Sequence, residues 1–214
     1  MRDVGEDSPT GYSTVAVISL TAGLPLQNIA QELVYCLSQL GTAVAITPEL
    51  VKNNLGINAL EPSNDFKLTA WLGAQEDHYN TVIYQCDEVG TLTSWTQQCI
   101  RHADVLLVFA DATQSHAVSA FEEKIETSSL RVTKELVLCH TESTRIPTNT
   151  ARWLELRPWI SRHYHIKVSN VQREGYITQC LPDSRQDAEQ EESPETDGPL
   201  FQTTRGRSQA KCTF

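Results

Sequence analysis

The chain has 214 residues, of which 40% are hydrophobic and 21% charged, and its formal net charge is −10. This composition predicts one globular domain with a full core plus an unpacked segment. The acidic net charge disfavours nucleic acid as a partner, because phosphate binding requires clustered lysine and arginine. No segment approaches the roughly 18 apolar residues of a membrane span, and residues 1–13 lack a signal-peptide pattern, so we expect a cytoplasmic protein without stable membrane insertion.

Apolar runs of strand length recur along the chain, and helical patterns separate them. After the first run, an apolar stripe from Leu26 to Leu40 predicts a helix, and Gly41 is placed to stop it. After the second run, Thr47 can act as an N-cap, and Gly56 ends the helix. The runs are residues 14–20, 43–47, 81–86, 104–110, 135–140 and 164–168.

Four further helical patterns follow between the later runs. The pattern in residues 63–77 predicts that Phe66 and Ala70 face the core, with Trp71 as a further candidate. In residues 115–126 the inward residues are Ala117 or Val118, followed by Phe121 and Ile125. The other two patterns cover residues 91–104, with Trp95, Cys99 and His102 about four apart, and residues 148–159.

Several of the apolar runs are apolar on both faces, which is typical of parallel strands covered by helices on each side. The alternation of strand and helix predicts a doubly wound, mostly parallel α/β sheet of about six strands, Rossmann-like or like a degenerate P-loop fold. The strand order stays open. We expect residues 1–12 to be disordered, 13–170 to form the module, and 171–214 to form an acidic, largely disordered tail.

The first strand and helix form the unit that binds phosphates in many nucleotide-binding proteins. A P-loop requires G-x-x-x-x-G-K-[ST], whereas the loop here reads SLTAGLPLQN, with Gly23 as its one glycine. No lysine or arginine occurs between Arg2 and Lys52, and the pattern G-x-G-x-x-G is missing as well. We therefore expect nucleotide-fold architecture without nucleotide chemistry, and no cofactor.

Acidic residues follow two later strands at the positions where a nucleotide hydrolase would hold magnesium. Asp87 follows the third run, and Asp111 follows the fourth. Without a phosphate loop, these acids are interpreted first as loop and cap residues. The alternative is a stand-alone nucleotide- or anion-binding module that uses Gly23, Asp87 and Asp111.

The sequence predicts neither a metal site nor a catalytic residue. His163 and His165 share one face of a strand, but no third ligand is suggested nearby in sequence. The six cysteines never form a C-x-x-C pair, so we expect reduced thiols, mostly in the core. Trp159, Arg157 and Arg162 form a small basic and aromatic cluster with His163. We interpret it as a solvated helix end, with an anionic headgroup or acidic partner as the alternative.

One long string is more specific than any of these motifs: WLGAQEDHYNTVIYQCDEVGTLTSWTQQCIRHADVLLVFAD. It resembles the region of neuropathy target esterase and related patatin-like phospholipases that lies between their cyclic-nucleotide-binding-like domains and the patatin catalytic domain. The resemblance runs from Ser13 to Val168. It implies a parent lysophospholipase that hydrolyses phosphatidylcholine and lysophospholipid esters at the cytosolic face of the endoplasmic reticulum membrane.

The catalytic motifs that this family implies do not occur in the chain. The family resembles plant patatin in using a serine in G-x-S-x-G, an oxyanion loop of the type G-G-G-x-R, and an aspartate in D-G-[GA]. The first two are missing, and Asp197 and Gly198 are followed by Pro199. We therefore expect a non-catalytic module or fragment that packs against neighbouring domains of a parent phospholipase or another protein, arising as a truncated product or an incomplete gene model.

Overall fold

The structure is a computed structural model, and it describes most of the predicted module. The described residues are 12–87, 90, 92–128, 131–140 and 149–168. The chain divides into two units, residues 1–170 and 171–214, and every described residue lies in the first. The predicted disorder of the two ends therefore stays a prediction, because residues 1–11 and 169–214 lie outside the described part.

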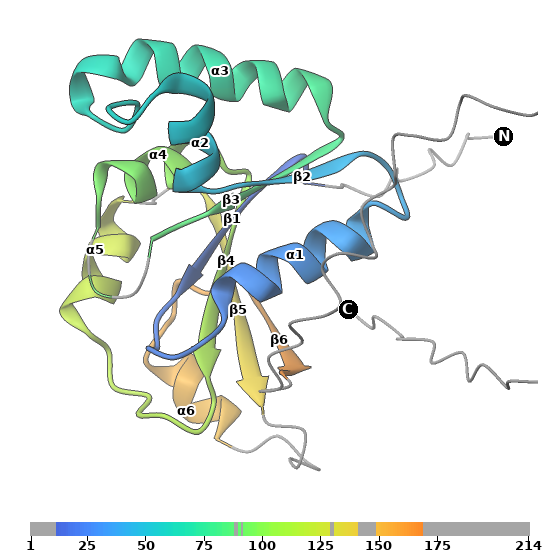
Figure 1. The fold of residues 1–214 in the computed structure, drawn as a ribbon. Coiled ribbons are helices and arrows are strands. Elements are labelled where there is room, and N and C mark those ends of the chain that lie inside the picture. Colours follow the sequence, from blue (N-terminus) through green and yellow to red (C-terminus); the bar gives the residue numbers. More distant parts are fainter. Residues whose placement is uncertain (1–11, 88–89, 91, 129–130, 141–148, 169–214) are drawn as a thin grey trace, which may run out of the picture. The chain divides into compact units, whose positions relative to one another are not determined.

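A six-stranded sheet with the order β2-β3-β1-β4-β5-β6 forms the centre of the module (Figure 1). Every neighbouring pair of strands is parallel. The predicted doubly wound, parallel sheet is thus confirmed, and the structure supplies the strand order. The strands are β1 (Thr14–Ser19), β2 (Ala43–Ile46), β3 (Thr81–Gln85), β4 (Val105–Asp111), β5 (Thr133–His140) and β6 (Arg162–Lys167).

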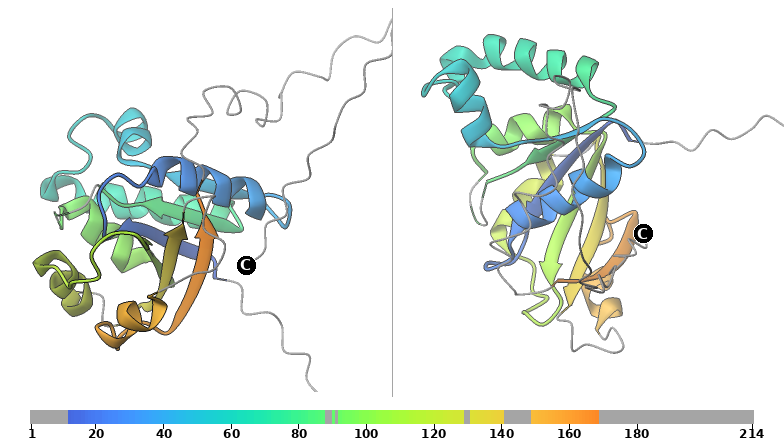
Figure 2. Two further views of the ribbon diagram at one scale, coloured as in Figure 1. Left: turned by 90° about the horizontal axis from the view of Figure 1, so that it is seen from below. Right: turned by 45° about the vertical axis from the view of Figure 1, so that its right-hand side comes forward.

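Helices cover both faces of the sheet, as Figure 2 shows from two further directions. The helix α1 (Leu26–Leu37) packs Leu26, Ile29 and Ala30 against one face. The other helices place their buried residues in the core on the opposite face. They are α2 (Pro48–Leu55), α3 (Asp65–His78), α4 (Ser94–His102), α5 (Ala120–Ser128) and α6 (Thr150–Glu155), with a 3-10 turn η1 (Pro62–Asn64) before α3.

The central strands are apolar on both faces because both faces are covered. In β1, Ala16 and Ile18 belong to the larger core, whereas Val15 and Val17 belong to the core under α1. Successive side chains of a strand point to opposite faces, so a continuous apolar run supplies both cores at once. The continuous apolar run of β1 is therefore explained by the two cores, because each core takes every second side chain of the strand.

Three details of the helices differ from the sequence prediction. The helix α1 ends at Leu37, and Leu40 lies in the following turn with 86% of its surface exposed. The helix α5 begins at Ala120, so Ala117 and Val118 precede it and are exposed. The helix α3 turns Leu68 and Leu72 to the core in place of the predicted Phe66 and Ala70.

The helix α3 buries the face opposite to Phe66 and Ala70, whereas the further candidate Trp71 is partly buried against the core, as predicted. Its buried residues are Leu68 and Leu72, whereas Ala70 is exposed and Phe66 has 89% of its surface exposed. Both faces of this helix carry apolar residues, so periodicity alone could not choose between them. The choice was made by the packing of Leu68 and Leu72 into the core shared with α2 and α4.

Three of the cysteines, Cys86, Cys99 and Cys139, are buried and free, which confirms the prediction for these residues. Burial raises the pKa of Cys99 well above its usual value and that of Cys139 to about 12. The thiols of Cys99 and Cys139 therefore stay protonated near neutral pH. All three cysteines pack as small residues of the two cores. Cys36 on α1 is not a free thiol, so the expectation of reduced cysteines is not met at this residue.

Candidate functional site

The strand order places a topological switch point at the carboxyl end of β1. The chain leaves β1 toward β2 and β3 on one side, and after β3 it crosses to β4 on the other side. Doubly wound sheets bind ligands outside the carboxyl ends of their strands at such a point. The loops that follow β1, β3 and β4 are therefore the candidate site, and they contain the residues that the sequence singled out: Gly23, Asp87 and Asp111.

The loop between β1 and α1 offers little to a phosphate group. Gly23 adopts a φ of 84°, which permits the turn, but Pro25 is the N-cap residue of α1 and has no N–H group. The N–H of Leu26 donates to the carbonyl oxygen of Leu24 at 2.8 Å. Two of the backbone donors that would face an anion at this helix end are thus missing or already used.

Asp111, at the end of β4, is held by its own turn. Its carboxylate accepts hydrogen bonds from the N–H and hydroxyl of Thr113 at 2.9 and 2.7 Å, and from Nε2 of Gln114 at 3.2 Å. Burial raises the pKa of Asp111, but these hydrogen bonds outweigh it and leave the pKa below its usual value. The carboxylate is ionised, and both of its oxygens are in use.

Two hydrogen bonds join the loops after β1 and β4 directly across the switch point. The N–H of Asp111 donates to Oγ1 of Thr21 at 2.8 Å, and Nε2 of Gln114 donates to the carbonyl oxygen of Ala22 at 3.0 Å. The structure therefore brings together the loops of Gly23 and Asp111, two of the residues of the alternative binding module. The two loops are joined by these hydrogen bonds and do not form a ligand-binding cleft between them.

Asp87 lies on the other side of β1, after β3, and belongs to the N-terminal cap of α4. The hydroxyl of Thr93 donates to Oδ2 of Asp87, and that of Thr96 donates to the same oxygen at 3.3 Å. The hydroxyl of Thr93 also accepts the N–H of Thr96 at 3.1 Å, so Thr93 is the N-cap residue. Asp87 is therefore a loop residue that accepts hydrogen bonds from the cap of α4, which agrees with its interpretation as a loop or cap residue.

A pocket of about 180 Å³ lies beside the switch point, at the carboxyl ends of β4 and β5. No sequence pattern predicts this pocket, because its lining comes from three separate parts of the chain. It is lined by Ala112, Thr113, Gln114, His116, His140, Asn149 and Trp153.

Three histidines of β5 and β6 lie in a row that begins at this end of the sheet. Nε2 of His140 on β5 lies 2.8 Å from Nδ1 of His165 on β6, so one ring donates a hydrogen bond to the other. The ring of His163 lies edge-on to His165, with 5.7 Å between the centroids. Burial lowers the pKa of His140 and of His165, which favours a neutral pair.

His140 was missed as a neighbour of His165 because only the pairing of β5 with β6 brings them together. Within the described ranges, no three His, Cys, Asp or Glu side chains form a group that could hold a metal ion. The prediction of no metal site in the whole chain stays a prediction. Among the same residues, no helix has the length and hydrophobicity that crossing a bilayer requires.

The interpretation of Arg157 as part of a solvated basic cluster was wrong. Only 1% of its surface is exposed, and its Nε and Nη2 donate to the two carboxylate oxygens of Glu122 at 2.7 and 3.0 Å. Its guanidinium carbon also lies 4.4 Å from the ring centroid of Trp153. Arg157 therefore joins α5 to the segment after α6, and it is not available to an anionic partner.

Comparison with known proteins identifies the family. The family model described as the P-loop like domain of the Neuropathy Target Esterase family matches residues 11–210. The chain belongs to the neuropathy target esterase family. It is 42% identical to the neuropathy target esterase sws of Drosophila virilis over 156 residues, and 41% identical to that of Drosophila grimshawi over the same length. Each match covers 72% of this chain and 10% of the relative, so the chain spans about a tenth of the length of these curated relatives.

Among solved structures, the module resembles a plasmid partition protein from Borrelia burgdorferi. The TM-score is 0.52 at 12% sequence identity, and the match covers 72% of this chain and 90% of that protein. This likeness shows the fold. Together with the family model, it establishes a P-loop-like architecture, while the loop after β1 lacks the residues of a P-loop.

Proposed function

We propose that this module is a non-catalytic domain of a neuropathy-target-esterase-like polypeptide, in which it packs against neighbouring domains. The observation that carries the proposal is the state of the switch point. Asp87 and Asp111 direct their carboxylates at groups of their own loops, and the loops after β1 and β4 are bonded to each other. A nucleotide would have to break these contacts, and the loop after β1 offers no lysine or arginine in return.

The family membership supports the wider part of the proposal. We propose that the parent polypeptide is a serine lysophospholipase at the cytosolic face of the endoplasmic reticulum membrane, and that this chain itself is cytoplasmic. The chain carries neither G-x-S-x-G nor G-G-G-x-R, so the nucleophile and the oxyanion donors of the family are not among its residues. Its partners would be the neighbouring domains of that polypeptide or another protein, with no nucleic acid and no cofactor.

Calorimetric titration of the chain with ATP and with GTP, each with magnesium, tests the non-binding part of the proposal. We expect no heat of binding up to about 1 mM nucleotide, where even weak sites give a signal. Micromolar binding would support the stand-alone nucleotide or anion binder instead. In that case, loss of binding in Asp111→Asn but not in Glu123→Gln, a control at an exposed acidic residue of α5, would place the ligand at the switch point.

A further inference from the structure

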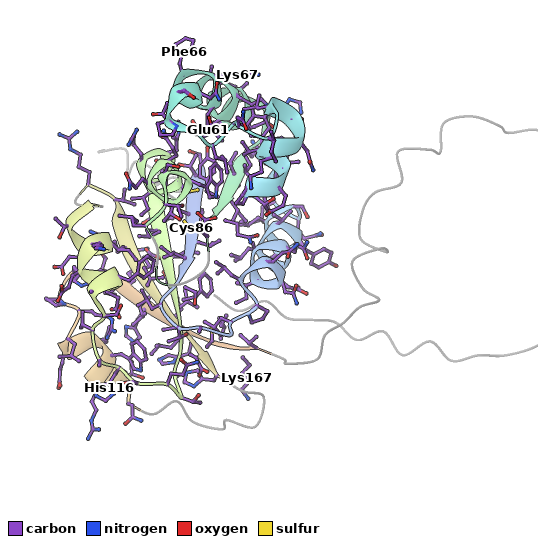
Figure 3. All side chains as sticks on the ribbon, turned by 60° about the vertical axis from the view of Figure 1, so that its left-hand side comes forward. Glu61, Phe66, Lys67, Cys86, His116 and Lys167 are labelled. Carbon is purple, nitrogen blue, oxygen red and sulfur yellow. The ribbon has the colours of Figure 1, made fainter. Side chains whose placement is uncertain are left out.

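The helix α3 carries an uncovered apolar seam on the face that points away from the sheet. Phe66, Ala70 and Gly73 follow one another at spacings of four and three, which places them along one side of a helix, and the charged Asp77 ends the same line four residues later. Phe66 has 89% of its surface exposed, and Ala70 and Asp77 are exposed as well. Figure 3 shows Phe66 and Lys67 at the outer end of the molecule, with Phe66 directed away from it.

The space beside the seam is open. A Cβ atom built on Gly73 would meet no other atom within 4 Å. The opposite side of α3 is already packed, because Leu68 and Leu72 are buried in the core. A helix with apolar residues on opposite sides is typical of one that is buried on both sides, so the seam lacks a partner in the described monomer.

A second exposed apolar residue lies at the same corner. Nζ of Lys67 donates to the carbonyl oxygen of Leu55 at 3.3 Å, which ties the start of α3 to the end of α2. Ile57 follows two residues after Leu55 and has 77% of its surface exposed. The corner between α2 and α3 therefore presents two large apolar side chains, Ile57 and Phe66, to the solvent.

The charges at the two ends of the seam are complementary to those of a second copy in antiparallel orientation. Lys67 is exposed near the N-terminal end of α3, and Asp77 is exposed near its C-terminal end. A two-fold axis through the middle of α3 would place Lys67 of one copy beside Asp77 of the other, and it would do so twice. Ala70 would face Gly73 and Ala74 of the other copy, where small side chains permit close approach.

We propose that α3 is a self-association surface through which two copies of this chain form an antiparallel, two-fold symmetric dimer. The helix has 14 residues and is therefore about 21 Å long. One helix pair of this length, with Phe66 and Ile57 at its ends, forms a small interface, so the dimer is weak. Its two ion pairs are exposed, so added salt weakens it further.

Sedimentation velocity of the full chain tests the proposal. We expect a monomer at about 10 μM and a growing dimer fraction toward about 1 mM, the range in which small interfaces associate. The Ala70→Glu variant places a charge in the middle of the seam of each copy, so two like charges meet in the dimer. We expect it to raise the dissociation constant at least about tenfold. The control is Ala151→Glu, the same substitution at an exposed position of α6, which leaves the dissociation constant unchanged.

Charge exchange tests the antiparallel register. Lys67→Glu and Asp77→Lys each weaken the dimer, because each creates like-charged neighbours, and the double variant restores it. The double variant keeps an acid near the N-terminus of α3 and a base near its C-terminus, so the monomer helix is preserved. The proposal would be overturned if the chain stayed monomeric at every concentration. It would also be overturned if Ala70→Glu and Ala151→Glu had equal effects on the dissociation constant, or if the double variant dimerised as weakly as the single variants.

Discussion

The buried ion pair between Arg157 and Glu122 makes a sharp prediction about stability. Arg157 is 1% exposed and Glu122 3% exposed, and the guanidinium binds both carboxylate oxygens. Nη1 of Arg157 also donates to the carbonyl oxygens of His116 and Trp153 at 3.1 and 3.2 Å. One side chain therefore connects α5, the segment before it and α6.

The perturbation is Glu122→Gln, which keeps the shape of the side chain and removes its charge. The guanidinium then stays buried without a counter-ion, since all of its other acceptors are neutral carbonyl groups. Removing one partner of a buried ion pair lowers the free energy of unfolding by about 3–5 kcal/mol. That is a large part of the roughly 5–15 kcal/mol by which a typical domain is stable.

Equilibrium unfolding in urea measures this cost, with the substitution Glu123→Gln as the matched control. Glu123 is the next residue of α5 and is exposed, so its substitution should change the free energy of unfolding by less than about 0.5 kcal/mol. In a thermal scan, Glu122→Gln should lower the Tm by roughly 6–20 °C for a domain of this size. The double variant Glu122→Met with Arg157→Met should recover part of the loss, because no unpaired charge remains.

Equal unfolding free energies for Glu122→Gln and Glu123→Gln would refute this reasoning, because they would mean that the guanidinium is hydrated or paired elsewhere. A double variant that is less stable than Glu122→Gln would refute the second step. The two carbonyl groups of His116 and Trp153 would then matter more than the unpaired charge.

Two further predictions concern the carboxyl edge of the sheet. Burial holds the pKa of His140 and His165 below the usual 6.5, so the unfolded chain binds more protons than the folded one as the pH falls through about 6.5. The unfolding free energy should therefore decrease between about pH 7 and pH 5, and His165→Asn should flatten this dependence in urea titrations; an unchanged slope would contradict the assignment. Thr93→Ala removes the N-cap of α4 and the hydrogen bond to Asp87, and it should cost about 1–2 kcal/mol in the same assay, whereas Thr127→Ala, exposed on α5, should cost less.

The candidate site shows where sequence reasoning succeeded and where it stopped. The missing P-loop residues were evident from the loop around Gly23, because each has a fixed position in a continuous motif. The partners of Asp87 and Asp111 were partly local, since Thr93 and Thr113 lie within a few residues. The hydrogen bond from the N–H of Asp111 to Thr21 joins residues 90 positions apart, and no local sequence pattern predicts it.

The sequence by itself determined the alternation of strands and helices, the parallel sheet and most element boundaries. Those features depend on local quantities: the run of apolar residues in β1, the cap at Thr47 and the stop at Gly56. Each acts within one or two turns of chain, so its signal survives without knowledge of the neighbours.

Only the tertiary structure decided the strand order, the meeting of His140 with His165, the burial of Arg157 and the face of α3 that enters the core. Arg157 looks exposed in sequence because an arginine is rarely buried, and it is buried here because Glu122, 35 positions away, supplies the opposite charge. For α3, both faces are apolar enough to be buried, so the neighbouring helices made the choice and left Phe66 outside. In each case the arrangement is stabilised by a contact between distant parts of the chain. Such a contact exists only once the sheet has assembled.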